Sequence, residues 1–241
     1  MIDLNKKFLI YGYGISGKSI ERYLINKNCK YDLYDDFIKI NKKNFISKKY
    51  LLKNINKYDY LVISPSIKIE KNNFLYNHKK KFLIDLDFLS IELSTQKIIG
   101  ITGTEGKSST CYYLKKILSK KYNTQIIGNF GNTILDKKNL NNYLSKIDIL
   151  IIELSSYQLD KLKFLKLHYA LITNIFSDHL DYHQNIKNYI SSKFRIQDLL
   201  YKNSCLFLSN RLFTKYRSYI KINKNRLILN NKFCIRNLDL M

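Results

Sequence analysis

The residues with the clearest chemical potential form one run, Thr102-Gly-Thr-Glu-Gly-Lys-Ser-Ser109, between an apolar stretch and a helical one. A glycine-containing loop that opens a helix can direct backbone N–H groups at phosphates, while a lysine neutralises their charge and a serine hydroxyl binds Mg²⁺. The run therefore predicts a nucleoside triphosphate site. Its spacing is not the standard GxxxxGK, because Ile101 stands where that pattern needs glycine. A chance Gly-Lys-Ser in a lysine-rich chain is the alternative.

A second glycine cluster, Gly12-Tyr-Gly-Ile-Ser-Gly17, follows the apolar run at 8–11 and precedes a helical stretch that ends near Asn26. This is the GxGxxG pattern in the strand-to-helix context of nucleotide-binding folds, and Asp32 and Asp35 lie where such folds place a ribose-binding carboxylate. The pattern alone would also fit a dinucleotide-dependent oxidoreductase. A tight turn without any ligand is the remaining alternative.

Three further polar residues follow apolar runs or lie in helical stretches downstream. Glu153 ends the run at 147–154, His179 follows the run at 169–174, and Lys193 lies in a helical segment. Parallel sheets bind ligands at the carboxyl ends of their strands, so Glu153 and His179 are candidates for the same edge. Each also has an ordinary interpretation, as a helix-terminal carboxylate, an exposed histidine and a surface lysine. Zinc binding by His179 and His183 is not favoured, since no third ligand stands at suitable spacing.

Short apolar runs alternate with helical stretches along the whole chain, which predicts an α/β protein with parallel sheets. A change near residue 94 predicts two domains. Residues 1–93 form a Rossmann-like domain for a nucleotide substrate. Residues 94–241 form a P-loop-type parallel-sheet domain for ATP, which we expect to be incomplete at its C-terminal end. The apolar runs expected to form strands are 8–11, 31–34, 60–64, 82–84, 97–101, 125–127, 147–154 and 169–174.

Composition limits the classes of protein that remain. The 241 residues carry 42 Lys and Arg against 19 Asp and Glu, a net charge of +23, yet 45% are hydrophobic, so the chain is globular and not disordered. Lysines are spread along the sequence and abound together with Asn, Ile and Tyr, as AT-rich codons would produce. We therefore favour a solvated basic surface over a nucleic-acid-binding module. No apolar run reaches the length of a membrane span, the four cysteines are far apart, and the N-terminus has no signal peptide. We expect a cytoplasmic protein.

Five motifs in this order resemble the Mur ligase family, and most closely its D-glutamate-adding members. They are TGTEGKSS at 102–109, GNFGN at 128–132, IELSSYQL at 152–159, NIFSDHLDYH at 174–183 and Tyr189-Ile-Ser-Ser-Lys193. The resemblance covers residues 8–209. Other Mur ligases and folylpolyglutamate synthetase share the ATP loop and are the alternative within this class.

The resemblance implies an ATP-dependent, amide-forming ligase of peptidoglycan precursor synthesis, whose substrates are UDP-N-acetylmuramoyl-L-alanine and D-glutamate. ATP would phosphorylate the substrate carboxylate, and the amine would then displace phosphate. It implies catalytic roles for Lys107, His179 and Lys193, and two Mg²⁺ ions held by Ser108 and Glu153 and by His179 and a carbamylated Lys193. The implied contacts to ATP are made by Gly103, Thr104, Glu105, Gly106, Lys107, Ser108 and Ser109. The implied contacts to the UDP substrate are made by Ile15, Ser16, Asp35, Asn129, Ser155 and Gln158.

Two departures from the family pattern matter. Glu105 stands where the family has asparagine, so a carboxylate beside the triphosphate should weaken ATP binding. The sequence also stops before the family's third domain, which holds D-glutamate. We therefore expect a truncated chain, with that domain lost or supplied by a separate chain.

Overall fold

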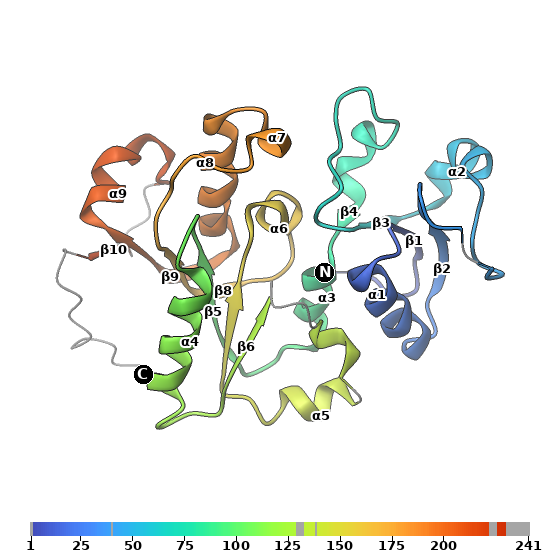
Figure 1. The fold of residues 1–241 in the computed structure, drawn as a ribbon. Helices are drawn as coiled ribbons and strands as arrows, with labels where there is room; N and C mark the ends of the chain where they lie inside the picture. Colours follow the sequence, from blue (N-terminus) through green and yellow to red (C-terminus); the bar gives the residue numbers. More distant parts are fainter. Residues whose placement is uncertain (1, 40, 129–132, 138, 222–225, 230–241) are drawn as a thin grey trace. The chain divides into compact units, whose positions relative to one another are not determined.

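A computed structural model describes residues 2–39, 41–128, 133–137, 139–221 and 226–229. Contacts divide the chain into two compact units, which are considered separately (Figure 1). The first unit comprises Met1–Thr95, Ile127–Lys146 and Lys161–Leu165, and the second comprises Gln96–Ile126, Ile147–Asp160 and Lys166–Met241. The domain boundary expected after residue 93 stays a prediction.

The first unit is built on a parallel sheet of four strands in the order β2-β1-β3-β4. The apolar centre of β1 is buried on both faces, which explains its unbroken hydrophobic run. Phe8 lies beside Tyr31 on one side and Tyr60 on the other. The strands are β1 (Lys7–Tyr11), β2 (Lys30–Tyr34), β3 (Tyr60–Ile63) and β4 (Phe82–Leu83).

Short helices complete the first unit. They are α1 (Ile15–Asn26), α2 (Lys48–Asn54), α3 (Asp85–Glu92) and α5 (Leu140–Leu144), with 3₁₀ turns η1 (Ile55–Lys57), η2 (Tyr76–Lys81) and η3 (Ile134–Asp136). Side-chain hydrogen bonds join the distant turn η3 and its N-cap residue Thr133 to α1. Arg22 Nε donates to Asp136 Oδ1 at 2.8 Å, and Thr133 Oγ1 donates to Ser19 Oγ at 2.5 Å.

The second unit contains a six-stranded sheet in the order β10-β9-β8-β5-β7-β6, with β5 at an inner position. Its strands are β5 (Lys97–Thr102), β6 (Thr124–Gly128), β7 (Ile149–Glu153), β8 (Leu167–Ile172), β9 (Leu200–Ser209) and β10 (Arg226–Leu229). The pairs β5–β7, β5–β8, β8–β9 and β9–β10 are parallel. The α/β class predicted from the sequence is confirmed.

Helix α4 (Lys107–Leu118) packs on this sheet through a buried cluster of Ile101, Cys111, Ile149 and Ile151. The remaining helices follow the strands in sequence: α6 (Ser156–Lys161), α7 (Leu180–His183), α8 (Ile186–Phe194), η4 (Arg195–Leu199), α9 (Asn210–Lys215) and η5 (Arg217–Tyr219). This core fixes where β5, β7 and β8 end, and the candidate site is built at those ends.

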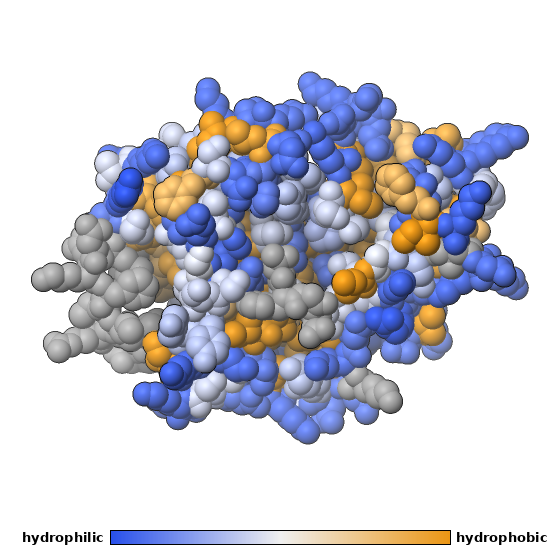
Figure 2. Space-filling model, viewed as in Figure 1, coloured by the Kyte–Doolittle hydropathy of each residue, from blue (hydrophilic) through white to orange (hydrophobic). Residues whose placement is uncertain are grey.

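The visible surface is mainly hydrophilic, with smaller apolar patches between the charged side chains (Figure 2). This distribution agrees with a solvated surface for the many lysines. Within the described residues, no helix is both long and apolar enough to span a bilayer.

Candidate functional site

The glycine loop after β5 has the strand–loop–helix geometry that its sequence predicts. Gly106 adopts a left-handed conformation with φ +71° and caps α4 without a side-chain hydrogen bond, so backbone N–H groups of the first helical turn are available. Gly103 lies so close to the next strand end that an added Cβ would fall 1.9 Å from Thr173 Oγ1. The loop therefore requires glycine at this position, and it presents a helix N-terminus suited to an anion.

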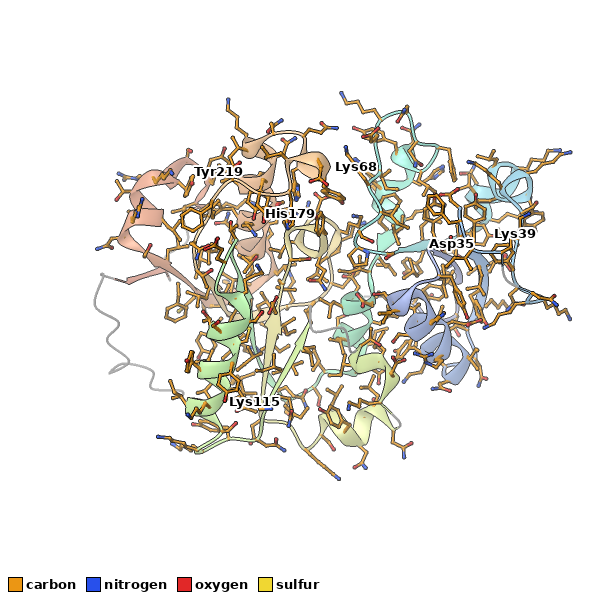
Figure 3. The ribbon with its side chains drawn as sticks, viewed as in Figure 1. Asp35, Lys39, Lys68, Lys115, His179 and Tyr219 are labelled. Atoms are coloured by element: carbon orange, nitrogen blue, oxygen red, sulfur yellow. The ribbon has the colours of Figure 1, made fainter. Side chains whose placement is uncertain are left out.

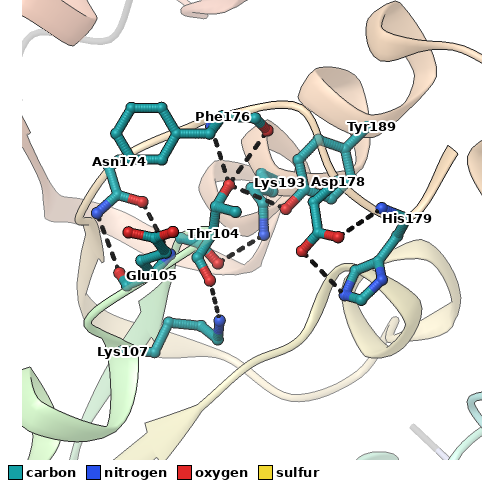
Figure 4. Close-up of polar contacts among 10 residues, drawn as sticks. Thr104, Glu105, Lys107, Asn174, Phe176, Asp178, His179, Tyr189 and Lys193 are labelled. Carbon is teal, nitrogen blue, oxygen red and sulfur yellow. Dashed lines mark hydrogen bonds and ion pairs between the residues drawn. The ribbon is translucent and has the colours of Figure 1, made fainter.

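Hydrogen bonds fasten the loop to the segment that follows β8 (Figure 4). Asn174 Oδ1 accepts from the Glu105 backbone N–H at 2.9 Å, and its Nδ2 donates to the Glu105 carbonyl at 3.0 Å. Thr104 Oγ1 accepts from the Phe176 N–H at 3.0 Å and lies 3.0 Å from the Tyr189 hydroxyl. These bonds use the backbone of Glu105 and leave its side chain exposed.

Lys107 and Ser108 occupy the first turn of α4. The Lys107 ammonium donates to the Thr104 carbonyl at 2.7 Å, which holds its charge over the loop. Ser108 Oγ donates to Glu153 Oε2 at 2.8 Å, and Glu153 is only 3% exposed at the end of β7. The structure therefore brings the predicted lysine, serine and carboxylate together, because β5 and β7 are neighbouring parallel strands. Ser109 follows them in the same turn and is exposed.

Lys193 approaches the same loop from α8. Its side chain is 2% exposed, its ammonium donates to the Gly103 carbonyl at 2.7 Å, and it lies 4.6 Å from the centre of the Tyr189 ring. Burial lowers the pKa of Lys193 to about 7, with a further decrease from the Lys107 charge and an opposing effect of Asp178. A surface-lysine interpretation is therefore wrong, and a large neutral fraction of this amine exists near neutral pH.

His179 lies at the start of α7, after the end of β8 (Figure 3). Its Nε2 is 3.4 Å from Asp178 Oδ2, and its backbone N–H donates to Asp178 Oδ1 at 2.8 Å. The imidazole is 44% exposed. Among the described residues, no three His, Cys, Asp or Glu side chains form a group able to hold a metal ion. The structure thus shows His179 paired with Asp178 and shows no metal-binding cluster around it.

Ser155 and Gln158, predicted to contact substrate, bond to each other at the start of α6. Gln158 Oε1 accepts from the Ser155 N–H at 2.9 Å, and Ser155 Oγ accepts from the Gln158 N–H at 3.2 Å. This reciprocal arrangement is a capping box, which accounts for both residue types without a ligand. Asn129, the third residue predicted downstream, lies outside the described residues.

In the first unit, Asp35 joins two loops at the carboxyl edge of the sheet. Its carboxylate accepts from the Tyr13 N–H at 2.7 Å and from the N–H groups of Phe37 and Ile38 at 2.8 and 2.9 Å. Burial raises the pKa of Asp35, but these three donors outweigh burial and the net pKa is lowered. Asp35 therefore has a structural role, in shaping the GxGxxG turn, that the sequence analysis did not anticipate.

The two other residues predicted for the uridine end lie at the start of α1. Ser16 Oγ donates to the buried Asp85 at 3.1 Å, whereas Ile15 is 65% exposed beside the glycine turn. A Cβ at Gly14 would meet no atom within 4 Å, so the space above this turn is open. Ile15 is thus available to a ligand, and Ser16 is engaged within the protein.

Sequence reasoning missed the residues that hold the loop in place. Asn174 belongs to the motif that follows β8, and Tyr189 lies one helical turn before Lys193. Residues four apart share a helix face, so the position of Tyr189 could have been inferred once Lys193 was a candidate. Thr173 and Asn174 carried no comparable signal, because their partners are separated from them by about seventy residues.

Comparison with known proteins identifies the class to which this fold and loop belong. The family model described as the Mur ligase middle domain matches residues 101–232. This match covers more than half of the chain, and the chain belongs to the Mur ligase family. The resemblance inferred from five short motifs is confirmed.

Two curated relatives share the name UDP-N-acetylmuramoylalanine--D-glutamate ligase. The protein of Protochlamydia amoebophila is 31% identical over 228 residues, covering 88% of this chain and 50% of the relative. That of Thermosipho melanesiensis is 31% identical over 209 residues, covering 79% and 47%. The chain thus spans about half the length of these relatives. A solved UDP-N-acetylmuramate:L-alanyl-gamma-D-glutamyl-meso-diaminopimelate ligase from Neisseria meningitides matches 93% of this chain and 77% of its own, with a TM-score of 0.53 and 14% identity, which supports the fold.

Proposed function

We propose that this chain carries the nucleotide- and substrate-binding parts of an ATP-dependent ligase that joins D-glutamate to UDP-N-acetylmuramoyl-L-alanine. The names of the Protochlamydia and Thermosipho relatives support this choice of substrates. The observation that carries the proposal is the convergence of four side chains on one glycine loop: Lys107, Ser108, Glu153 and Lys193.

The chemical difficulty is that the triphosphate and the substrate carboxylate are both anions. In the first step, the carboxylate oxygen bonds to the γ-phosphorus while the bond to ADP breaks. In the second, the amine of D-glutamate bonds to the acyl carbon, phosphate leaves and the amine loses a proton. The Lys107 ammonium and the first-turn N–H groups of α4 place positive charge where the phosphates must lie, and so reduce the repulsion in the first step.

Ser108 and Glu153 fit a Mg²⁺ ion. Both present oxygen, the donor atom that Mg²⁺ prefers, and such ions usually take one or two carboxylates and complete their shell with phosphate oxygens and water. A buried carboxylate with a hydroxyl at 2.8 Å is consistent with this use. When bound, the ion would screen the phosphate charge.

Lys193 fits a metal only in a modified form. Its ammonium has no lone pair to donate, but the neutral amine can bond through Nζ to the carbon of CO₂, with release of one proton, to give an anionic carbamate. A pKa of about 7 supplies the neutral amine. The carbamate oxygens, together with the exposed imidazole of His179, would then hold a second Mg²⁺ ion.

Two sets of residues are proposed for the UDP substrate. Ile15, Ser16 and Asp35 are proposed for the uridine end, and Asn129, Ser155 and Gln158 for the muramoyl part. Exposure of Ile15 and the open space over Gly14 favour the first assignment. For Asp35, Ser155 and Gln158 the proposed role is to shape the loops that contact substrate, since their polar atoms are already hydrogen-bonded.

Calorimetry on the purified 241-residue chain tests the proposal in two parts. We expect Mg-ATP to bind the wild-type chain, and Lys107→Ala to abolish that binding while the circular dichroism spectrum stays unchanged. We expect UDP-N-acetylmuramoyl-L-alanine to bind more tightly than UDP-N-acetylmuramate, because the alanine carboxylate is the group to be phosphorylated. Equal affinity for the two UDP compounds would contradict the assigned substrate, and unchanged ATP binding in Lys107→Ala would contradict the assigned loop.

Because the matched relatives are about twice as long, amide formation is assayed in a separate experiment. The chain is mixed with the C-terminal half of the Protochlamydia relative, ATP, the UDP substrate and D-glutamate. We expect the D-glutamyl product to form with wild-type chain and to be absent with Lys107→Ala.

A further inference from the structure

An open cavity of about 320 Å³ lies on the surface at the edge of the six-stranded sheet opposite to the ATP loop. It is bordered by Lys97, the first residue of β5, and by His168 near the start of β8. The glycine loop follows the other end of β5, which lies about 17 Å away because a strand rises about 3.3 Å per residue. The cavity is therefore separate from the candidate site described above.

An irregularity in β9 builds this cavity. Leu167 of β8 pairs with Leu200 of β9. Tyr169, two residues further along β8, pairs with Cys205, which is five residues further along β9. The additional residues of β9 form a bulge at which Asn203 takes the left-handed conformation, with φ +69°. All four residues of the bulge line the cavity: Tyr201, Lys202, Asn203 and Ser204. Bulges re-aim side chains and often lie beside binding sites.

The lining combines positive charge with aromatic rings. Lys97 and Lys202 are both exposed, and no carboxylate is among the described residues that line the cavity. The Tyr201 ring lies 4.8 Å from the His168 ring at an interplanar angle of 52°. Ammonium groups beside one cavity attract a phosphate, and adjacent rings favour a planar ligand.

His168 supplies a donor with a fixed tautomer. Its Nδ1 accepts from the Ile98 backbone N–H at 3.1 Å, so the ring proton lies on Nε2. Burial, and then the Lys97 charge, lowers the pKa of His168, which keeps the imidazole neutral at pH 7. The neutral His168 ring therefore offers one N–H donor, at Nε2.

We propose that this bulge cavity is a second ligand site, which binds a phosphate monoester carried on an aromatic or heteroaromatic ring. Lys97 and Lys202 bind the phosphate, the ring packs against Tyr201, and His168 Nε2 donates a hydrogen bond. A volume of about 320 Å³ accommodates a ligand of the size of a nucleoside monophosphate. The site does not depend on the ligase activity proposed above.

Phenyl phosphate is the simplest probe of this site, and histidine signals of the ¹⁵N-labelled chain are the readout. The chain contains four histidines, so each can be assigned by substitution. We expect phenyl phosphate to shift the His168 signals, and inorganic phosphate and phenol each to bind at least about tenfold more weakly. Shifts confined to His179 and His183 would place the probe at the ATP loop and overturn the proposal.

Lysine variants separate a built site from general attraction to a basic protein. Lys97→Ala and Lys202→Ala should each weaken phenyl phosphate binding by about tenfold. The matched control is Lys120→Ala, which removes the same charge from an exposed position in the same unit and should leave the affinity unchanged. Equal losses of affinity in all three variants, or equal affinity for phosphate and phenyl phosphate, would contradict the proposal. Either result would show that the basic surface attracts anions without selecting among them.

Discussion

The side chain of Lys193 illustrates how burial creates reactivity that a sequence does not display. A lysine among 42 basic residues is most simply a surface group, yet this one is buried and bonded to the loop carbonyl of Gly103. The family resemblance of its sequence motif identified Lys193 as a candidate site residue. The lowered pKa of Lys193 follows from its burial in the tertiary structure, which the motif does not show. Asp35 shows the converse: the sequence favoured a ribose contact, and the structure shows a carboxylate occupied by three backbone N–H groups.

We expect carbamylation of Lys193 to increase as the pH rises through about 7, because only the neutral amine reacts with CO₂. The folded-state pKa is depressed from 10.5, so the stability that this group contributes is complete above the unfolded value and is lost as the pH falls toward about 7. A ¹³C NMR titration with labelled bicarbonate follows the carbamate signal directly. Asp178→Asn should move the midpoint to lower pH, since Asp178 stabilises the ammonium, and Lys193→Arg should abolish the signal. A carbamate signal that persists in Lys193→Arg would contradict the assignment.

We expect Glu105→Asn to strengthen Mg-ATP binding by about tenfold at low ionic strength, because it removes an exposed negative charge next to the triphosphate. The backbone bonds to Asn174 do not involve the Glu105 side chain, so the loop geometry should be retained. Calorimetry at two salt concentrations measures the effect, which should decrease as salt is added. Weaker binding by the variant would indicate that the Glu105 carboxylate contacts a cation and not only the phosphates.

At the scale of elements, local pattern predicted strands β1 to β8 but neither β9 nor β10, and it did not predict which distant segments the strands meet. The apolar run at 97–101 became β5, and the glycine loop and α4 followed as expected. The described residues of 127–146 and 161–165 pack with the first unit through long-range contacts such as Arg22 with Asp136. No periodicity encodes such pairs, and the bulge in β9 likewise arises from its pairing with β8.

Asp87 is the residue on which the packing of α3 most clearly depends. Its carboxylate accepts from the N–H of Ile84 at 2.9 Å, capping α3, and from the N–H groups of Lys163 and Phe164 at 2.8 and 2.7 Å. We expect Asp87→Ala to lower the free energy of unfolding by about 3 kcal/mol at pH 4, because one buried and two partly buried N–H donors lose their acceptor. Glu70→Ala is the control, since this exposed ion pair with Lys68 contributes about 0.5 kcal/mol or less.

The pH dependence of that loss has a defined sign. Burial raises the pKa of Asp87 to about 6, although the backbone donors oppose this. A carboxyl group whose pKa is higher in the folded protein than in the unfolded chain stabilises the fold fully at a pH below its unfolded pKa. This contribution decreases as the pH rises through the folded pKa of about 6. Urea unfolding followed by tyrosine fluorescence should therefore show a larger cost of Asp87→Ala at pH 4 than at pH 7. A cost that grows with pH would show that the ionised form is the favoured one.

At the scale of the whole molecule, charge is a poor guide to function. The net charge of +23 resembles that of nucleic-acid-binding proteins, but hydrophilic side chains are spread over the visible surface (Figure 2). The few glycines are more informative, because most of those described occupy turns with positive φ or close backbone approaches. Motif order along the chain, and not composition, allowed the family to be inferred before the fold was known.

The two units should respond separately to the two ligands of the proposed reaction. Hydrogen exchange of the 241-residue chain measures this, because each unit has one uncapped helix N-terminus beside a glycine turn, at α1 and at α4. We expect Mg-ATP to slow exchange in the first turn of α4, and UDP-N-acetylmuramoyl-L-alanine to slow exchange in the first turn of α1. At a ligand concentration of 100 times Kd, each should add about 2.7 kcal/mol to the stability of the form that binds it. Lys107→Ala should remove the first effect and retain the second, whereas loss of both would show that one ligand site depends on the other.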